Sequence, residues 1–291
     1  MKHIAKLAAI AALVSSALTL AQPVKLTVAA TPIPQAELLE ALKPTLAKQG
    51  VELDVKVFND YVQPNLQVEE KHLDANYFQH IPYLEKFNKD RGTHLVSASK
   101  PVHIEPFGAY SGKVKKLADL PQGATVAIPN DPTNAGRALL LLDQGGVIKL
   151  KNRSNIYPTL KDIAANPKHI KIKELEAATL PRVLNQVDLA LINANYALEA
   201  KLNPKRDALL VETTSPYANL LVARPDNKNS DAVKKLATAL TSPEAKRFIE
   251  THYKGAVVPA FCSTPPQPRR PRRHADHRPG LFHVEQAGVL S

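Results

Sequence analysis

The chain has 291 residues, of which 44% are hydrophobic and 22% charged, a composition that supports a buried core and excludes disorder along the whole length. Its single cysteine, Cys262, excludes an internal disulfide and a cysteine-based zinc site. The formal net charge is +11, but much of the excess lies near the N-terminus and in an arginine-rich segment after Phe261, so we expect no nucleic-acid partner.

Residues 1–21 have the pattern of a secretory signal peptide, with Lys2 and Lys6 before an apolar run from Leu7 to Leu20. A membrane anchor is the alternative, but the run is shorter than the roughly 20 residues that span a bilayer. No later stretch is apolar for long enough to span. Because no cysteine follows the run, we expect an exported periplasmic or cell-envelope protein without a lipid anchor.

The first part of the mature chain predicts a βαβ unit. Residues 24–28 alternate apolar and polar side chains, as in a strand, and residues 38–46 carry leucines at helical spacing. Pro44 is expected to kink this helix, and Gly50 to end it. Residues 51–57 alternate again and predict a second strand.

The same alternation of strands and helices recurs after residue 110 and predicts an α/β fold. The expected strands are 125–128, 170–175 and 189–192, and the expected helices are 135–142, 158–165 and 180–187. Residues 130–134 read as a polar turn, and Ser242 and Pro243 mark the start of a late helix. The density of proline and arginine in residues 262–291 predicts a disordered tail.

Motifs for nucleotide, dinucleotide and zincin chemistry are missing, and the histidines form no metal-ligand pair, so we expect no cofactor, no metal site and no catalytic residue. The segment Gly108–Gly112 superficially resembles a nucleophile elbow, but its serine is one place late. An exported hydrolase that uses His80 as a base remains an alternative, although no partner residue stands at a fixed spacing from it.

An aromatic stretch at residues 74–83 is a candidate wall of a ligand site. Phe78, His80 and Tyr83 could enclose an apolar or thioether side chain. The alternative is aromatic packing in the core, with His80 hydrogen-bonded locally.

Polar candidates follow two later strands. In residues 129–139 a strand leads into a helix start, whose free N–H groups, together with Arg137, suit a carboxylate. An ion pair at the surface or between lobes is the alternative for Arg137. Amide oxygens of Asn193 and Asn219 could accept hydrogen bonds from an ammonium group, and turn formation is their alternative role.

Four stretches together resemble the MetQ/NlpA family of methionine-binding proteins of ABC importers. They are Phe58–Asn65, Asp74–His80, Pro129–Leu142 and Ser215–Asn219, within a likeness that runs from Val24 to Phe261. The resemblance implies a two-lobed periplasmic-binding-protein fold, type II-like, with a ligand cleft between the lobes. The expected division is residues 22–108 as lobe 1, residues 109–212 as lobe 2 and residues 213–261 as a return to lobe 1.

The resemblance also implies roles for seven residues. Arg137 would hold the ligand carboxylate, and Asn193 and Asn219 its amino group. The ligand side chain would be surrounded by Tyr61, Phe78, His80 and Tyr83. We therefore expect a monomeric, non-enzymatic protein that captures L-methionine, and possibly D-methionine, and delivers it to the membrane subunits of an ABC transporter. Another apolar amino acid or a short peptide is the alternative ligand.

Overall fold

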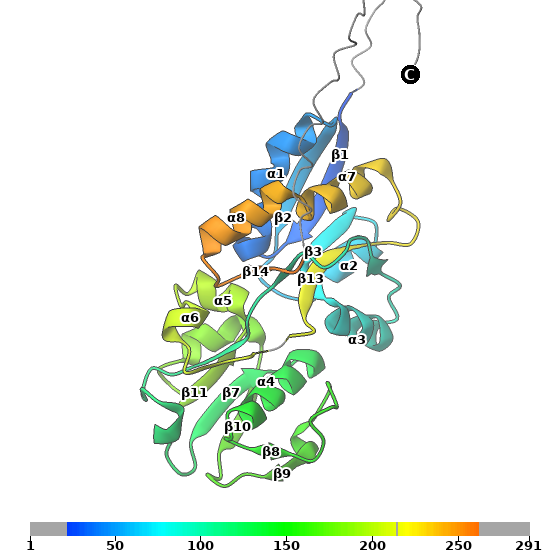
Figure 1. Ribbon diagram of the computed structural model, residues 1–291. Coiled ribbons are helices and arrows are strands. Elements are labelled where there is room, and N and C mark those ends of the chain that lie inside the picture. Colours follow the sequence, from blue (N-terminus) through cyan, green and yellow to red (C-terminus); the bar gives the residue numbers. More distant parts are fainter. Residues whose placement is uncertain (1–21, 214, 262–291) are drawn as a thin grey trace, which may run out of the picture.

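The computed structural model describes residues 22–213 and 215–261, so the expected signal peptide (1–21) and the expected tail (262–291) lie outside the described residues. The described chain forms two lobes, each built around its own sheet, which lie one above the other in Figure 1. The predicted two-lobed α/β class is confirmed. Among the described residues, no helix combines the length and apolar character that a membrane crossing requires.

Lobe 1 contains a mixed seven-stranded sheet in the order β14-β5-β13-β3-β1-β2, with β4 paired to β13. Its strands are β1 (Val24–Ala30), β2 (Val51–Val57), β3 (Ala75–His80), β4 (Val96–Ser97), β5 (His103–Ile104), β13 (Ala218–Ala223) and β14 (Val258–Pro259). β1 is parallel to β2 and β3, as the predicted βαβ unit requires, whereas β13 returns from lobe 2 and pairs antiparallel to β3 and β5.

Helices cover both faces of this sheet. They are the π-helical turn η1 (Pro32–Ala36), α1 (Glu37–Ala47), α2 (Gln63–Glu69), α3 (Ile81–Arg91), α7 (Asp231–Leu240) and α8 (Pro243–Tyr253). Leu26 and Val28 of β1 face the core under α1, α7 and α8, whereas Ala29 faces the core under α2 and α3. Alternate residues of one central strand thus hold two helical layers in place (Figure 1).

Lobe 2 contains a five-stranded sheet in the order β10-β7-β11-β6-β12. Its strands are β6 (Gly108–Tyr110), β7 (Thr125–Pro129), β10 (Lys171–Leu175), β11 (Leu189–Ile192) and β12 (Leu210–Val211), and a small second sheet joins β8 (Lys149–Leu150) to β9 (Ile163–Ala165). Its helices are α4 (Pro132–Gln144), α5 (Ala194–Glu199), α6 (Pro204–Asp207) and the 3-10 turns η2 (Leu117–Asp119), η3 (Leu160–Asp162) and η4 (Ala177–Val183).

Several predicted elements differ from the structure. The helix predicted at 158–165 is a 3-10 turn followed by β9, because Asp162 accepts hydrogen bonds from Thr159 and closes a single turn. The helix predicted at 180–187 is replaced by η4, whose internal Pro181 lacks the N–H that an α-helix needs. α4 begins at Pro132, inside the predicted polar turn, whereas α1 contains Pro44 and ends at Ala47, close to the predicted stop at Gly50.

Two chain segments connect the lobes. The first joins β5 to β6 and contains Glu105, and the second joins β12 to β13 and contains Glu212. The strands on either side of these segments belong to different sheets, so we propose that the lobes divide within these two connections, next to the predicted boundaries at 108/109 and 212/213. Both acidic residues lie beside Arg137, which makes this junction the centre of the site described below.

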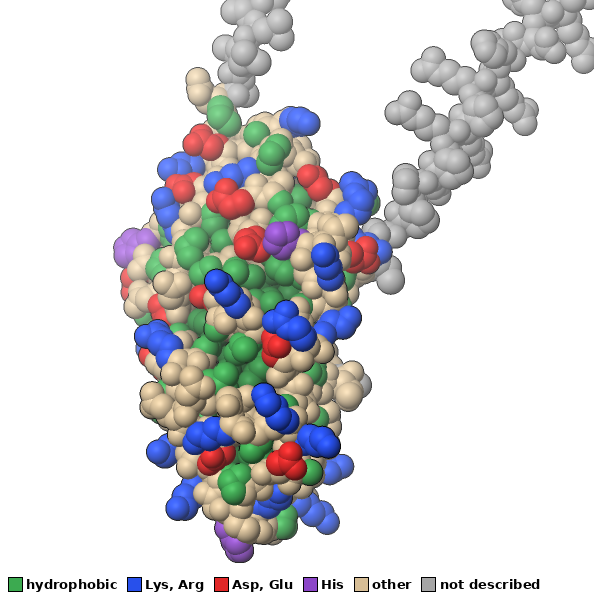
Figure 2. Space-filling model, turned by 90° about the vertical axis from the view of Figure 1, so that its left-hand side faces the viewer, with side chains coloured by type: hydrophobic (Ala, Val, Ile, Leu, Met, Phe, Trp, Pro, Cys, Tyr) green, Lys and Arg blue, Asp and Glu red, His purple; other side chains and the backbone are tan. Residues whose placement is uncertain are grey.

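Charged side chains are dispersed over the surface. On the face in Figure 2, lysine and arginine side chains lie over both lobes with aspartate and glutamate between them, rather than in one continuous stripe. This distribution matches the interspersed charges of the sequence and is typical of a solvated surface.

Replacing Leu39 by alanine tests the core under α1. Leu39 is fully buried, so Leu39→Ala should lower the free energy of unfolding by roughly 2 to 5 kcal/mol. The control variant is Leu160→Ala. Leu160 is 40% exposed, so this change should alter the free energy of unfolding by about 0.5 kcal/mol or less. Urea unfolding followed by circular dichroism measures both, and equal losses in the two variants would contradict this assignment of the core.

Candidate ligand-binding site

A cavity lies at the junction of the two lobes. It encloses about 350 Å³ of space unoccupied by atoms, part of it open to solvent. All of the residues that the sequence singled out as ligand-binding line it, namely Tyr61, Phe78, His80, Tyr83, Arg137, Asn193 and Asn219. The structure therefore brings together side chains separated by up to 158 residues in the sequence (219 minus 61).

Strand ends position most of these residues. Phe78 and His80 end β3 in lobe 1, and Tyr83 follows in the first turn of α3. Asn193 directly follows β11 in lobe 2, and Arg137 lies in the second turn of α4, which begins just after β7. The parallel strands β7 and β11 thus deliver both lobe 2 groups to the same sheet edge, as expected for an open α/β sheet.

An aromatic wall forms the lobe 1 side of the cavity. Tyr61, Phe78 and Tyr83 lie within 6.0 Å of one another, measured between ring centroids, and Tyr61 also contacts Tyr196 of lobe 2 at 5.0 Å. Tyr83 also packs against Phe87 in a small apolar cluster. These rings therefore pack against one another and line the cavity at the same time.

His80 lines the cavity as a neutral side chain. Its Nδ1 accepts a hydrogen bond from the backbone N–H of Tyr83 at 3.2 Å, which caps α3. Burial lowers the pKa of His80 to about 3, and the positive charge of Arg137 acts in the same direction. Because Nδ1 is an acceptor, the ring proton is on Nε2, which leaves that N–H as a possible donor.

Arg137 is buried, and the side of its guanidinium that carries Nε and Nη2 is hydrogen-bonded. Its Nε donates to Glu212 Oε2 at 2.9 Å, and its Nη2 donates to Glu212 Oε1 and, at 2.9 Å, to the backbone oxygen of Glu105. Its guanidinium lies over the rings of Phe107 and Tyr217, at 5.0 and 4.4 Å from their centroids. Burial is the largest single influence and would lower the pKa of Arg137. The charge and hydrogen bonds of Glu212, with Tyr217 and Glu105, together outweigh burial and raise the pKa, so Arg137 is a permanent cation.

The ion pair that was the alternative role of Arg137 is therefore present, between α4 and the second interlobe connection. It does not use the whole guanidinium, because Nη1 has no hydrogen-bond partner among the described residues. The predicted helix-start donors are partly occupied: Asp131 caps α4 and accepts from the backbone N–H of Asn134 at 2.9 Å. Arg137 Nη1 is thus the remaining cationic donor on this side of the cavity.

A chain of side-chain hydrogen bonds orients the amide of Asn193. Asn134 Nδ2 donates to the carboxylate of Asp131, which leaves Asn134 Oδ1 to accept from Asn193 Nδ2 at 3.0 Å. This leaves Asn193 Oδ1 as the end of the chain, and it has no partner among the described residues. Asn193 therefore presents an acceptor to the cavity, an orientation that follows from the acceptor-only carboxylate of Asp131.

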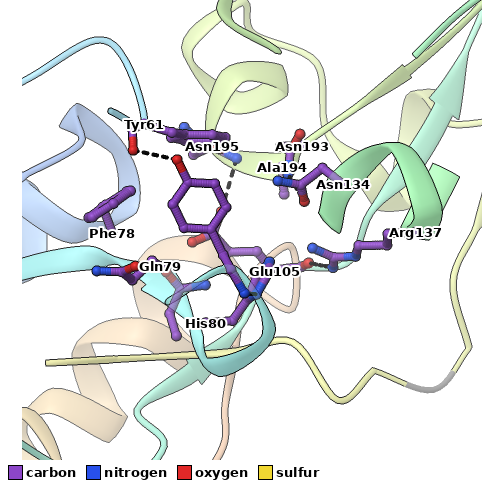
Figure 3. Close-up of a pocket in the computed structure, with 12 residues that line it drawn as sticks. Tyr61, Phe78, Gln79, His80, Glu105, Asn134, Arg137, Asn193, Ala194 and Asn195 are labelled. Atoms are coloured by element: carbon purple, nitrogen blue, oxygen red, sulfur yellow. Dashed lines mark hydrogen bonds between the residues drawn. The ribbon is translucent and has the colours of Figure 1, made fainter. Parts of the chain in front are cut away.

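Sequence reasoning missed several residues that line the cavity. They are Gln79, Glu105, Asn134, Ala194 and Asn195. Gln79 and Asn134 stand inside stretches already singled out, and Asn195 stands two places after the predicted Asn193, so their neighbours were a usable signal. Glu105 stood in none of them, and its role depends on partners distant in the chain. In Figure 3 it lies between the aromatic side of the cavity, with Tyr61 and Phe78, and the side with Asn134 and Arg137.

Hydrogen bonds cross between the lobes around the cavity. The hydroxyl of Tyr61 donates to Asn195 Oδ1 at 2.6 Å, and the hydroxyl of Tyr196 donates to the backbone oxygen of Asn59 at 3.1 Å. The backbone N–H of Asn195 donates to Glu105 Oε2 at 3.1 Å. Within the described residues no group of three or more histidine, cysteine, aspartate or glutamate side chains is placed to hold a metal ion.

Solved structures of similar proteins share this architecture. The chain is 50% identical to a nutrient-binding protein from Burkholderia cenocepacia bound to methionine, with 81% of this chain and 100% of that chain covered and a TM-score of 0.77. It is 42% identical to a periplasmic substrate-binding protein of an ABC transporter from Coxiella burnetii, with the same coverage and TM-score. The methionine-binding lipoprotein MetQ of Bacillus subtilis is 42% identical over 240 residues, which are 81% of this chain and 88% of that protein.

One prediction is wrong. The missing cysteine after the apolar run led us to expect no lipid anchor, whereas the Bacillus relative is a lipoprotein, a class that is exported and lipid-anchored. The prediction failed because it depended on one residue type in residues 1–21, outside the described part of the chain, and on no property of the folded lobes. Export to the cell envelope agrees with the relatives.

The sequence pattern of the NlpA lipoprotein family matches residues 26–261, which include every strand and helix of both lobes except the first two residues of β1. This range agrees with the likeness that the four sequence stretches indicated. The chain belongs to the NlpA lipoprotein family.

Proposed function

We propose that this protein captures methionine outside the cytoplasmic membrane and delivers it to the membrane subunits of an ABC transporter, without catalysing a reaction. The observation that carries the proposal is the cavity between the lobes, which has a cation at one end and an aromatic wall at the other. Support also comes from the Burkholderia structure, which is 50% identical and bound to methionine, and from the Coxiella substrate-binding protein.

Arg137 would hold the carboxylate of the ligand. A guanidinium that already neutralises Glu212 can still donate Nη1 to a second carboxylate, and charge-assisted hydrogen bonds of this kind are the stronger ones. The α-amino group would lie against Asn193 and Asn219, because Asn193 Oδ1 is a buried acceptor without a partner and Asn219 Oδ1 lines the same cavity. An ammonium group can satisfy such an orphaned acceptor.

The side chain of methionine would lie against Tyr61, Phe78 and Tyr83. A thioether is apolar and polarisable, and it makes favourable contacts with aromatic rings. The neutral state of His80 supports this location, because no second cation then borders the apolar end of the cavity. One methylene is worth only about 1 to 3 kcal/mol in such a pocket, so other apolar amino acids would compete weakly.

Binding would be coupled to closure of the lobes. The contacts of Tyr61 with Asn195 and Tyr196 join the lobes directly beside the cavity, so a ligand that fills the cavity favours the arrangement in which these contacts form. The transporter would recognise the closed form, as in other binding proteins that close about a hinge.

Ligand identity can be measured directly. Mass spectrometry of small molecules released from the protein purified without unfolding should detect methionine. Calorimetric titration of protein freed of ligand should give saturable binding of L-methionine. A protein that releases no methionine and binds none in the titration would contradict the proposed function.

A paired substitution tests Arg137 without leaving a buried, unpaired carboxylate. Arg137→Met combined with Glu212→Gln removes both charges of the pair, and we expect methionine affinity to fall roughly ten- to a hundredfold, as for loss of a charged hydrogen bond. The control variant, the exposed Glu174→Gln, keeps both Arg137 and its partner Glu212 and should bind methionine as tightly as the wild type. Wild-type affinity in the paired variant would remove Arg137 from the site.

The pKa of His80 predicts a pH dependence of stability. The unfolded histidine takes up a proton near its ordinary pKa of 6.5, whereas folded His80 does so only near 3, so the neutral side chain stabilises the fold above pH 6.5 and this contribution is lost as the pH falls. Relative to His80→Gln, the wild type should lose roughly 3 kcal/mol of unfolding free energy between pH 7 and pH 4. Urea titrations at several pH values measure it, and a difference that is constant with pH would refute the assignment.

A further inference from the structure

Glu105 is a buried carboxylate that the proposed function does not yet use. It lies on the first connection between the lobes, lines the cavity and is only 6% exposed. Its neighbours in Figure 3 come from lobe 1 on one side and from lobe 2 on the other. A buried charge is unfavourable unless its surroundings compensate it, so its partners indicate what this carboxylate is for.

The partners of Glu105 are all hydrogen-bond donors. Its Oε1 accepts from Gln35 Nε2 and lies 2.8 Å from His103 Nε2, and its Oε2 accepts from the backbone N–H of Asn195. Three donors and no acceptor are the surroundings of an ionised carboxylate. Oε2 has accepted only this one hydrogen bond, which leaves it free to accept another.

His103 does not supply a positive charge to Glu105. Burial raises the pKa of Tyr77 well above its ordinary value, so the Tyr77 hydroxyl keeps its proton. That hydroxyl contacts His103 Nδ1 and has no other partner among the described residues, so it donates to Nδ1. Nδ1 is then an acceptor, and the one ring proton is on Nε2, directed at Glu105. His103 is thus neutral.

Arg137 does not hydrogen-bond to the carboxylate of Glu105, and its charge acts on Glu105 only through space. Its side-chain nitrogens bond to Glu212 and to the backbone oxygen of Glu105, but not to the Glu105 carboxylate. Among the described residues, no lysine or arginine forms an ion pair with it. The Glu105 carboxylate therefore borders the cavity without a lysine or arginine in direct contact with it among the described residues.

Two further acceptors border the same cavity. Gln35 Nε2 bonds to both Glu105 Oε1 and Asn219 Oδ1, so a single amide holds these two oxygen-bearing side chains next to each other. Asn193 Oδ1 is the unpartnered acceptor at the end of the chain from Asp131. An alkylammonium group has three N–H donors, which matches acceptors from Glu105, Asn193 and Asn219.

We propose that the Glu105 carboxylate is the counter-ion for the α-ammonium group of the bound amino acid, and that it makes the site select zwitterions over ligands that carry only a carboxylate. This inference rests on the proposed function and names the group that recognises the amine. Arg137 and Glu105 then hold the two charged ends of one ligand, and the two amides complete the hydrogen bonds of the ammonium.

The experiment compares two ligands on two proteins. Calorimetry or a competition assay measures the affinities of methionine and of desamino-methionine, in which hydrogen replaces the α-amino group. In Glu105→Gln, methionine affinity should fall roughly ten- to a hundredfold, while affinity for the desamino analogue stays the same or rises, because a like charge has been removed. The preference for methionine should therefore collapse. The exposed Glu174→Gln variant is the matched control and should retain the wild-type preference.

The outcomes separate the two proposals. A wild-type protein that binds no methionine contradicts the proposed function itself. A wild type that binds methionine, together with Glu105→Gln that keeps the same preference, overturns the role of Glu105 alone. If Glu105→Gln does not fold, Glu105→Asp, which retracts the carboxylate, should still reduce the preference, and an unchanged preference there also overturns the inference. Equal affinity of the wild type for both ligands would overturn it without any variant.

Discussion

A buried guanidinium has to be neutralised, and the way Arg137 meets this requirement organises the junction between the lobes. Its partners are Glu212 and the backbone oxygen of Glu105, which stand on the two segments that connect lobe 1 to lobe 2. Leaving such a charge unpaired would be strongly destabilising. Satisfying one side chain of α4 therefore also determines where both connecting segments run, and the cavity lies where they meet.

The polar side of the cavity is oriented by side chains that also have ordinary structural roles. Asp131 is the N-cap of α4, and the same carboxylate fixes the amide of Asn134, which in turn fixes that of Asn193. On the opposite side, Gln35 joins Glu105 to Asn219. The carboxylates of Asp131 and Glu105 can only accept hydrogen bonds, so they fix which end of each neighbouring amide carries the oxygen. The acceptor oxygens at the cavity are therefore oriented before a ligand binds, which reduces the entropy lost on binding.

Local sequence patterns predicted the elements that depend on local physics. The alternation of apolar and polar side chains predicted the boundaries of β2 and most of β1. The Ser242–Pro243 pair marks the start of α8, where the Ser242 hydroxyl accepts a hydrogen bond from the backbone N–H of Ala245. The patterns failed at 158–165 and 180–187, where apolar spacing suggested helices. There a one-turn capping arrangement and an internal proline limit the helix to 3-10 turns.

The sequence by itself determined the α/β class, the family and which side chains could meet a carboxylate, an ammonium group and a thioether. Only the tertiary structure decided how they are used: that Arg137 pairs with Glu212, that His80 is neutral and that the Glu105 carboxylate borders the cavity without a lysine or arginine bonded to it. The reason is that these properties depend on burial and on partners 70 or more residues away, such as Gln35 for Glu105, and such partners meet only when both lobes and their connections have folded.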